Sequence, residues 1–521
     1  MPDIDEVLLK EIKLKYRLVL GGDYEQLKAE GFIPRPGVKP IKLALPFKWR
    51  YPDRNVEFTL HSWRFLNPLL SKFLSSSDTS YLIEALEYVK NWQSYKTSED
   101  KKSQFLWYDM AVGLRSIILG FFLELYKKNI LPLDDGDFLL LSDLATEHID
   151  NLSCEKNITA GNHALYQVMG LRILSLSVGQ GERFLGYCTS ILENLISLSF
   201  DKYSVNNENS PFYHGYNVEL LSRMRCGVFP GLDEKINNII RDGSAITGWL
   251  TGIDGKYYSV GDSEGEGKPI KSAGPFDLIQ SRVKHVHKDL SPSGYLAVRT
   301  HPRIDVLDSF SLLFHATNSS YVHAHADHLS FVVFLRGQEL ITDPGKYTYE
   351  YGAWRDYFIS DKAHNVIGLS DRIFLPKDIS LGAASIDPIE LGEDFYRLSG
   401  SVRKSEDFSF SRNLLYRPEC GLFLHDTVCN QTSSNSEMRF HFGKDISAIF
   451  EDGLVVLKKD KNLLAILKPQ NNYNSISIRR GEEAGFGWAS KHYNKKFEID
   501  VLVIEYAANV SEIITEILFK S

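Results

Sequence analysis

Residues 323–343 read HAHADHLSFVVFLRGQELITD, and this stretch decides the fold of the C-terminal half of the chain. Two apolar runs, 329–335 and 338–342, lie on either side of Arg336 and Gly337. β-Branched and aromatic residues favour extended strands, and the glycine between the runs favours a tight turn. We therefore expect two antiparallel strands joined as a hairpin.

The same pattern of short strands continues on both sides of this hairpin. Further strands, separated by Gly, Asn, Asp and Pro, are expected at 294–300, 309–316, 364–369, 421–429, 437–443, 453–457, 463–467 and 499–505. Many short strands at such spacing are typical of antiparallel sheets packed as a sandwich. Residues 286–521 are therefore expected to form an all-β domain.

Upstream of residue 285, apolar side chains recur with the period of a helix. Helices are expected at 79–93, 105–128, 160–177, 181–198 and 233–241. Because the connections between them are short and polar, neighbouring helices should be antiparallel. We expect a mixed N-terminal segment, 1–60, interrupted by prolines, followed by a helical domain at 61–285.

The composition is that of an ordinary soluble globular protein, with 521 residues, 43% hydrophobic and 24% charged. A net charge of -8 provides no basic field for nucleic acid or an anionic membrane. The longest apolar run, 117–123, is too short to span a bilayer. The first twenty residues mix acidic and basic side chains, so no secretory signal is expected and a cytoplasmic location is favoured over a periplasmic one. Five cysteines without a C-x-x-C pair fit reduced thiols.

The string HAHADH at 323–328 concentrates histidine and aspartate just before the expected hairpin. Neutral imidazoles and carboxylates are ligands that suit zinc. One alternative is that these side chains only cap strands and line a polar crevice. Another is the H-x-H-x-D-H signature of metallo-β-lactamase-like hydrolases, which carries a dinuclear zinc site. That signature is followed by a helix in an αββα fold, whereas here a strand follows.

Residues 323–372 contain H-x-H-x-D, an apolar strand, D-x-G-x-Y-x-Y at 343–349 and A-H-N at 363–365. In this order the motifs resemble the C-terminal signature of the heparinase II/III-like polysaccharide lyases. TAGNH at 159–163, ENSPFYH at 208–214 and YSVGD at 258–262 resemble further motifs of that family. The resemblance covers about residues 55–375. It implies an N-terminal (α/α) toroid of antiparallel helix pairs followed by a C-terminal antiparallel β-sandwich.

The resemblance also implies a reaction. Such lyases cleave a glycosidic bond beside a uronic acid by β-elimination: a base removes the C5 proton, an acid protonates the departing O4, and the uronate carboxylate is neutralised. By the resemblance, Asn162 and His163 bind the carboxylate. Tyr213 is the acid, and either Tyr213 or His323 is the base. Tyr216 is the alternative if the alignment is shifted by three residues.

The implied ligands of one structural zinc ion are His325, Asp343 and His364. The spacing does not by itself bring them together. If the hairpin turns near Gly337, Asp343 lies opposite about Val332, so residues 321–328 must fold back toward it.

Candidates for contacts with the glycan are Arg115, Glu208, Tyr216 and Arg355. A guanidinium group pairs with a carboxylate or sulfate through two hydrogen bonds. The alternative for each arginine is an internal salt bridge. Asn162 has its own alternative, since a residue beside Gly161 could simply cap the helix at 160–177.

The expected function is therefore a lyase acting on a uronate-containing polysaccharide or oligosaccharide. A uronyl C5-epimerase of bacterial surface-glycan biosynthesis would use the same residues, because it also abstracts the C5 proton. A third alternative is a non-catalytic glycan-binding protein. The expected absence of a signal favours a substrate inside the cell, either an imported oligosaccharide or a glycan under assembly.

Overall fold

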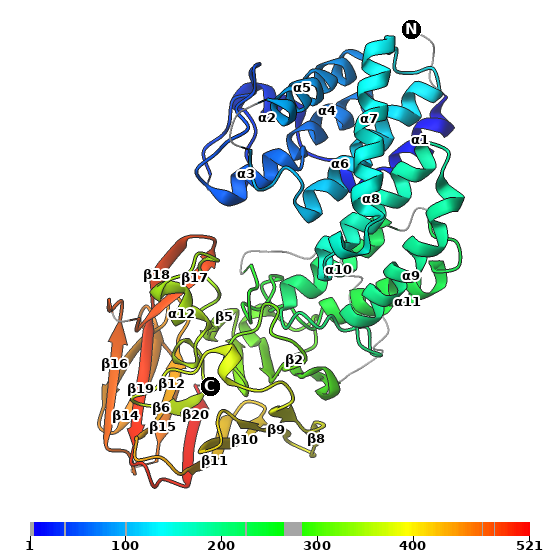
Figure 1. Ribbon diagram of the computed structural model, residues 1–521. Helices are drawn as coiled ribbons and strands as arrows, with labels where there is room; N and C mark the ends of the chain where they lie inside the picture. The colour runs from blue at the N-terminus through cyan, green and yellow to red at the C-terminus, as the bar shows by residue number, and fades with distance from the viewer. Residues whose placement is uncertain are drawn as a thin grey trace. The chain divides into compact units, whose positions relative to one another are not determined.

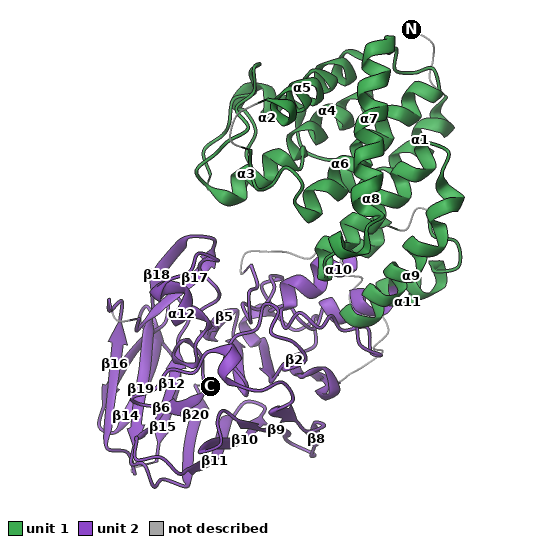
Figure 2. Ribbon diagram, viewed as in Figure 1, with its two compact units in different colours: residues 1–199, 219–240 green, residues 200–218, 241–521 purple. Residues whose placement is uncertain are grey.

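The computed structural model of the protein describes residues 5–35, 38–98, 102–224, 227–264, 284–470, 472–483 and 485–520 (Figure 1). The chain forms two compact units (Figure 2). Unit 1 comprises residues 1–199 and 219–240, and unit 2 comprises residues 200–218 and 241–521. The chain passes between the units after residue 199, within helix α10 (Pro211–Met224) and within helix α11 (Asp233–Thr247).

Unit 1 is helical, and its predicted helices are found at α5, α6, α8, α9 and α11. Helices α1, α2 and most of α3 lie in the segment 1–60, where no helix was predicted. The signal for them was the aspartate cap, because Asp5, Asp23 and Asp53 each accept hydrogen bonds from backbone N–H groups of the first turn. The helices are α1 (Glu6–Lys15), α2 (Tyr24–Glu30), α3 (Arg54–His61), α4 (Asn67–Ser76), α5 (Ser80–Thr97), α6 (Asp109–Lys127), α7 (Asp135–Leu152), α8 (Gly161–Ser177) and α9 (Gly181–Ser199).

Helices α6 and α8 pack with their backbones in direct contact. A Cβ atom added to Gly113 of α6 would lie 2.4 Å from the carbonyl oxygen of Tyr166 in α8. A Cβ atom added to Gly170 of α8 would lie 2.4 Å from the carbonyl oxygen of Gly113. Only glycine allows so close an approach, so these two residues fix the helix pair that carries the start of α8.

Unit 2 contains antiparallel sheets with strand orders β1-β2-β3-β4-β5, β13-β14-β15-β20-β11-β10-β9-β7, β16-β19-β12-β6 and β17-β18, and β8 pairs with β9. A short helix, α12 (Ala353–Ile359), lies between β5 and β6. The strands are β1 (His285–Leu290), β2 (Tyr295–Thr300), β3 (Phe310–His315), β4 (Ser330–Leu335), β5 (Gln338–Ile341), β6 (Ile367–Leu369), β7 (Ala384–Ile386), β8 (Glu390–Leu391), β9 (Tyr396–Arg403), β10 (Phe408–Arg417), β11 (Gly421–Asn430), β12 (Ser436–His441), β13 (Ser447–Glu451), β14 (Leu454–Lys459), β15 (Asn462–Pro469), β16 (Ser475–Arg480), β17 (Trp488–His492), β18 (Lys495–Glu498), β19 (Asp500–Tyr506) and β20 (Glu512–Phe519).

The predicted hairpin is confirmed as β4 and β5, with Leu335 opposite Gln338 and a register shift before Val333 meets Ile341. The larger sheets share one apolar core. Phe331 of β4, Phe410 of β10 and Phe440 of β12 belong to it, although they come from three different sheets. This face-to-face packing is the predicted β-sandwich, and with the helical half it confirms the predicted fold class.

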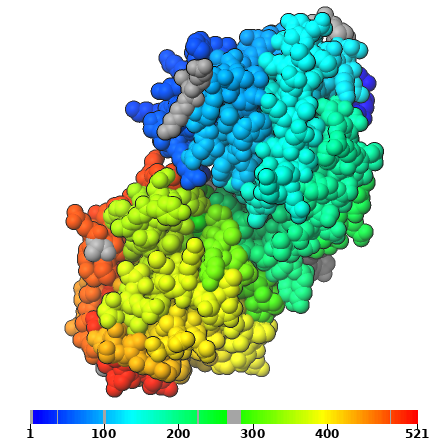
Figure 3. Space-filling view, viewed as in Figure 1, coloured from blue at the N-terminus to red at the C-terminus, as the bar shows by residue number. Residues whose placement is uncertain are grey.

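The limits of the units differ from the predicted boundary at residue 285. Residues 200–218 and 241–264 belong to the same compact unit as the sheets, and they bring polar residues to the site described below. On the face of unit 2 drawn in Figure 3, the strands around residue 400 reach the surface, in yellow. Within the described part of the chain, no helix has the length and apolar character needed to cross a membrane.

Candidate active site

Tyr213 and His323 are brought together, as the sequence predicts. Tyr213 lies in the first turn of α10, which begins at Pro211, a residue well suited to the start of a helix. His323 lies on the segment before β4 and has a left-handed backbone, with a φ of 56°. The two rings stack almost parallel, with centroids 3.6 Å apart and planes inclined by 8°.

The buried carboxylate of Asp262 contacts the histidine of this pair. It lies 2.9 Å from Nδ1 of His323 and 3.0 Å from Nε2 of His325. Arg355 donates to both of its oxygens, at 2.6 and 3.0 Å. Burial alone would raise the pKa of Asp262, but hydrogen bonds from the two histidines and the charge of Arg355 outweigh it, and the pKa lies well below its ordinary value.

The ionised carboxylate fixes the tautomers of both histidines. Because Asp262 can only accept, Nδ1 of His323 and Nε2 of His325 must carry protons. In a neutral His323 the lone pair is then on Nε2. Among the described residues, the carboxylate nearest to that nitrogen is Glu208, whose Oε2 is 3.6 Å away, too far for a direct hydrogen bond. Nε2 of His323 therefore remains available to take a proton.

The hydroxyl of Tyr213 is part of a second network. It lies 2.9 Å from the hydroxyl of Tyr349, which in turn accepts a hydrogen bond from Lys346 at 3.1 Å. Burial raises the pKa of Tyr213, although the hydrogen bond with Tyr349 opposes the shift. Tyr213 therefore keeps its proton at neutral pH, which suits an acid better than a base.

The other residues predicted in this unit have different surroundings. Tyr216 packs on the same helix, with its ring 6.2 Å from that of Tyr213. Glu208 is buried and faces His323. Arg355 was predicted to contact the glycan, but both of its terminal nitrogens are engaged by Asp262, so it positions that carboxylate.

Asn162 and His163 belong to unit 1 and open helix α8. Nδ1 of His163 lies 3.1 Å from Oδ2 of Asp109, the first residue of α6. The helix is capped by Ala160, so Asn162 is not the capping residue. Its amide makes no hydrogen bond within the described part of the chain. Both side chains are half-buried and retain groups that can donate to an anion.

The prediction that Arg115 binds a glycan is wrong. Arg115 is fully buried in α6, and its guanidinium donates to the carbonyl oxygens of His61 and Leu106 at 2.6 and 2.7 Å. It also donates to Nε2 of His148 at 3.1 Å and lies 4.5 Å from the ring centroid of Trp92. Burial lowers its pKa to about 9. Each of its three nitrogens makes a hydrogen bond inside the helical core, and the fully buried group is out of reach of an external anion.

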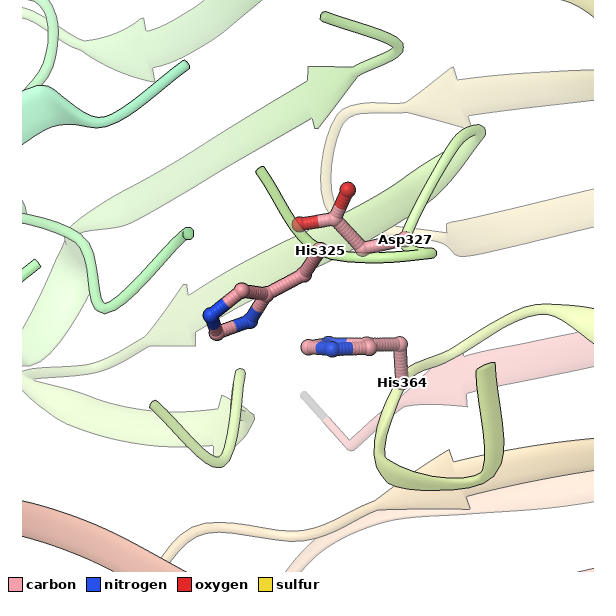
Figure 4. Close-up of side chains that lie close together, drawn as sticks. All are labelled: His325, Asp327 and His364. Atoms are coloured by element: carbon pink, nitrogen blue, oxygen red, sulfur yellow. The ribbon is translucent and has the colours of Figure 1, made fainter. Parts of the chain in front are cut away.

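A second cluster contains the candidate metal ligands. Nitrogen and carboxylate atoms of His325, Asp327 and His364 lie within 4.8 Å of one another, and all three side chains are buried (Figure 4). Among the described residues, Nδ1 of His325 and Nε2 of His364 have no hydrogen-bond partner. His364 uses its other nitrogen, Nδ1, to contact Asp343 at 3.0 Å.

These unpartnered nitrogens fit a metal ion. Asp262 and Asp343 are both held ionised, the latter with its pKa lowered to about 2 despite its burial, chiefly by His364. They fix protons on the far nitrogens of His325 and His364, so in the neutral imidazoles each unpartnered nitrogen presents a lone pair. Asp343 also raises the pKa of His364 against the effect of burial, so a metal ion bound at Nε2 of His364 would displace a proton. Two imidazole nitrogens and a carboxylate form a donor set that suits zinc.

The structure changes one member of the predicted ligand set. Asp327, rather than Asp343, groups with His325 and His364. Asp343 contacts the far side of the His364 ring and also belongs to an overlapping group with His315 and Asp327. Residues 321–328 lie against the end of α12, because the backbone N–H of Ala326, beside His325, donates to the carbonyl oxygen of Ile359 at 2.9 Å.

Four residues of these networks were given no role from the sequence: Asp109, Asp262, Lys346 and Tyr349. Asp262 and the pair Lys346 and Tyr349 do lie in motifs that resemble the lyase family, GD at 261–262 and DPGKYTY at 343–349. Asp109 lies in no such motif. Its contact with His163 depends on the packing of α6 against α8, which no local pattern encodes.

The architecture and the site together define a toroid-plus-sandwich protein with a paired tyrosine and histidine in its sheet-containing unit. Residues 283–516 match the family model described as Heparinase II/III-like, C-terminal. No curated protein sequence matches the chain.

Solved structures extend the likeness to the whole chain. A heparinase III structure has a TM-score of 0.73 at 16% identity, covering 99% of this chain and 86% of that one. A heparinase III that is the BT4657 gene product has a TM-score of 0.70 at 15% identity, with coverage of 99% and 86%. The heparan sulfate lyase HepC from Pedobacter heparinus has a TM-score of 0.65 at 15% identity, with coverage of 99% and 84%. At such low identity the comparison establishes the shared fold.

Proposed function

We propose that this protein is a polysaccharide lyase that cleaves a uronate-containing glycan by β-elimination. The observation that carries the proposal is the stacked pair of Tyr213 and His323, held from behind by the buried Asp262. It supplies an acid and a base side by side, in a chain that shares its fold with structures named as heparinases and a heparan sulfate lyase. An anionic uronate polymer or oligomer is therefore the proposed substrate class.

In the proposed mechanism, Nε2 of His323 removes the C5 proton and the hydroxyl of Tyr213 protonates the departing O4. Asp262 stabilises the imidazolium that forms, because its negative charge lies 2.9 Å from Nδ1. Asn162 and His163 donate hydrogen bonds to the uronate carboxylate. This neutralisation allows negative charge to develop as the C5 proton leaves.

We further propose that His325, Asp327 and His364 hold one zinc ion. Bound zinc would supply a structural link between the segment before β4 and the segment before β6, and it would not take part in proton transfer. The support is the pair of buried, unpartnered imidazole nitrogens described above. Asp343 would orient His364 from behind, as a carboxylate commonly does for a metal-bound histidine.

The test is product analysis after incubation with a panel of uronate glycans in heavy water. A lyase shortens the chains and produces the ultraviolet absorbance of an unsaturated uronate. A C5-epimerase, the second candidate, leaves the chains intact and introduces deuterium at C5. Tyr213→Phe protein, purified in the same way, controls for a contaminating lyase. Full-length, deuterium-free chains across the whole panel would rule out C5 chemistry.

A further inference from the structure

Tyr213 is connected to a buried lysine through Tyr349. Lys346 and Tyr349 lie on the loop between β5 and α12, in the same unit as Tyr213. The hydroxyls of Tyr213 and Tyr349 are 2.9 Å apart, and Nζ of Lys346 is 3.1 Å from the hydroxyl of Tyr349. Nζ of Lys346 also lies 2.5 Å from Glu264, so the chain of contacts continues to a carboxylate.

Exposure rises at the far end of this chain of contacts, between Lys346 and Glu264. The side chain of Lys346 is 4% exposed, whereas that of Glu264 is 29% exposed. A proton entering at the Glu264 carboxylate could therefore reach the Tyr213 hydroxyl through groups that are already within hydrogen-bonding distance.

The direction of the hydrogen bonds is fixed by the lysine. An ammonium group has donors and no acceptor, so the Tyr349 oxygen must accept from Lys346. The Tyr349 hydrogen is then free to point to the Tyr213 oxygen. Tyr213 in turn keeps its own hydrogen for a different acceptor, which in the proposed reaction is the departing O4.

Charge around Tyr349 acts in both directions. The ammonium of Lys346 lies 4.6 Å from the Tyr349 ring centroid, and the guanidinium of Arg355 lies 5.4 Å from it. Burial and the nearby carboxylates of Asp262 and Glu264 nevertheless raise the pKa of Tyr349. Tyr349 therefore passes its proton to Tyr213 only as Lys346 supplies the next proton through the hydrogen bond between them.

We propose that Tyr349, Lys346 and Glu264 form a proton relay that reprotonates Tyr213 after each cleavage. The proposal rests on the proposed function, in which Tyr213 gives its proton to O4. It assigns Tyr349 and Lys346 to the resetting of the enzyme, a step separate from the bond cleavage.

The proton balance is as follows. The O–H bond of Tyr213 breaks as the new O–H bond at O4 forms, leaving a phenolate. Tyr349 transfers its proton to that phenolate, and an N–H of Lys346 restores the Tyr349 hydroxyl. The neutral amine then regains a proton from water through the Glu264 carboxylate. The proton that His323 took from C5 returns to solvent, so one proton enters and one leaves per cycle.

Rapid-mixing kinetics on the full-length protein separate the first turnover from later ones. Tyr349→Phe removes one hydroxyl from the relay and keeps the ring, and Lys346→Met removes the ammonium. Each variant should release about one equivalent of unsaturated product at close to the wild-type rate, after which steady-state turnover should fall by about 10²-fold, a common loss for an interrupted proton transfer. Raising the concentration of imidazole buffer should restore the steady-state rate of the variants and leave the wild type unchanged.

Two matched controls address local damage. Tyr351→Phe makes the same change on the same loop at a side chain that is 99% exposed. Lys491→Met removes a half-buried lysine of unit 2 that pairs with Glu339 at 3.0 Å and makes no contact with Tyr213 or Tyr349 among the described residues. Neither control should show a first-turnover burst or a response to imidazole.

The outcomes are distinct. If Tyr349→Phe slows the first turnover as much as later ones and does not respond to imidazole, Tyr349 positions Tyr213 and is not a relay. If both variants keep the wild-type steady-state rate, the relay is wrong and the lyase assignment stands. If the wild type itself turns over no uronate glycan, the proposed function fails and the relay fails with it.

Discussion

Replacing Asp262 with asparagine tests whether this carboxylate organises the site. Every described contact of the two carboxylate oxygens is with a donor. Oδ1 accepts hydrogen bonds from His325 and from one terminal nitrogen of Arg355. Oδ2 accepts hydrogen bonds from His323 and from the other terminal nitrogen of Arg355. An asparagine of the same shape must place its NH₂ group against two of these donors, whichever way the amide is turned.

The magnitude follows from the bonds that are lost. A hydrogen bond to a charged group contributes about 1.5–3 kcal/mol, so losing two predicts a destabilisation of about 3–6 kcal/mol. Removing one partner of a buried ion pair independently predicts about 3–5 kcal/mol, because Arg355 would lose its counter-charge. Nδ1 of His323 also loses its fixed acceptor, so kcat should fall by about 10²–10⁴-fold, the range for an acid–base group.

Asp426→Asn is the matched control. Asp426 is also a fully buried carboxylate of unit 2. Its two oxygens accept hydrogen bonds from Nε and Nη2 of Arg412, at 2.7 and 3.1 Å. It makes no described contact with His323 or Tyr213. Its replacement should reduce stability by a similar amount while the protein that remains folded keeps kcat within a few-fold of wild type.

The assays are urea unfolding for both variants and steady-state kinetics well below the unfolding transition. Equal losses of kcat in Asp262→Asn and Asp426→Asn would show that activity follows stability alone. An Asp262→Asn protein with unchanged stability would refute the account of Asp262 as the central acceptor.

Three further predictions concern the tyrosine pair, the metal and pH. Tyr213→Phe should lower kcat by about 10²–10⁴-fold with little change in KM or thermal stability. If steady-state kinetics show this loss for Tyr216→Phe instead, Tyr216 is the acid. Elemental analysis should find about one equivalent of zinc in the wild type and less than about a tenth of an equivalent in Asp327→Asn and His364→Ala. Asp343→Asn should weaken zinc binding by only about 10–100-fold. Equal losses of zinc in the two aspartate variants would show that Asp343 is a ligand. His214 accepts from the backbone N–H of Asn206 and lies 2.9 Å from the carbonyl oxygen of Gly243, and burial lowers its pKa from 6.5 to about 4. The unfolded chain therefore binds a proton at His214 at a higher pH than the folded chain does. The resulting contribution to the free energy of unfolding, about 3 kcal/mol, is fully present above pH 6.5 and is lost as the pH falls toward 4. In urea unfolding, the stability of His214→Gln should therefore fall less steeply at acid pH than that of the wild type.

The contrast between Arg115 and Arg355 shows the limit of assigning roles from residue type. Both were predicted to contact an anionic glycan because guanidinium groups recognise carboxylates and sulfates. In the structure, Arg115 uses its donors inside the helical core and Arg355 uses its donors on Asp262. The sequence shows the donors, but the partner that satisfies them is chosen by the packing of distant segments.

The sequence by itself determined the class of fold and the residues that meet at the centre of unit 2. The helical and strand periods are local properties, so α5, α6, α8 and the β4–β5 hairpin could be predicted closely. The motifs also identified Tyr213, His323, His325 and His364, because their order along the chain is itself a signature.

Only the tertiary structure decided which atoms these residues present. Asp262 is 61 residues from His323 and 93 from Arg355, yet it fixes the proton positions of the site histidines. Asp327 groups with His364 from 37 residues away, and Tyr349 reaches Tyr213 from 136 residues away. Such contacts depend on how separate loops fold back over one core. A local pattern reports the residues that are available, and the packing of the whole unit sets the hydrogen bonds that give each of them its role.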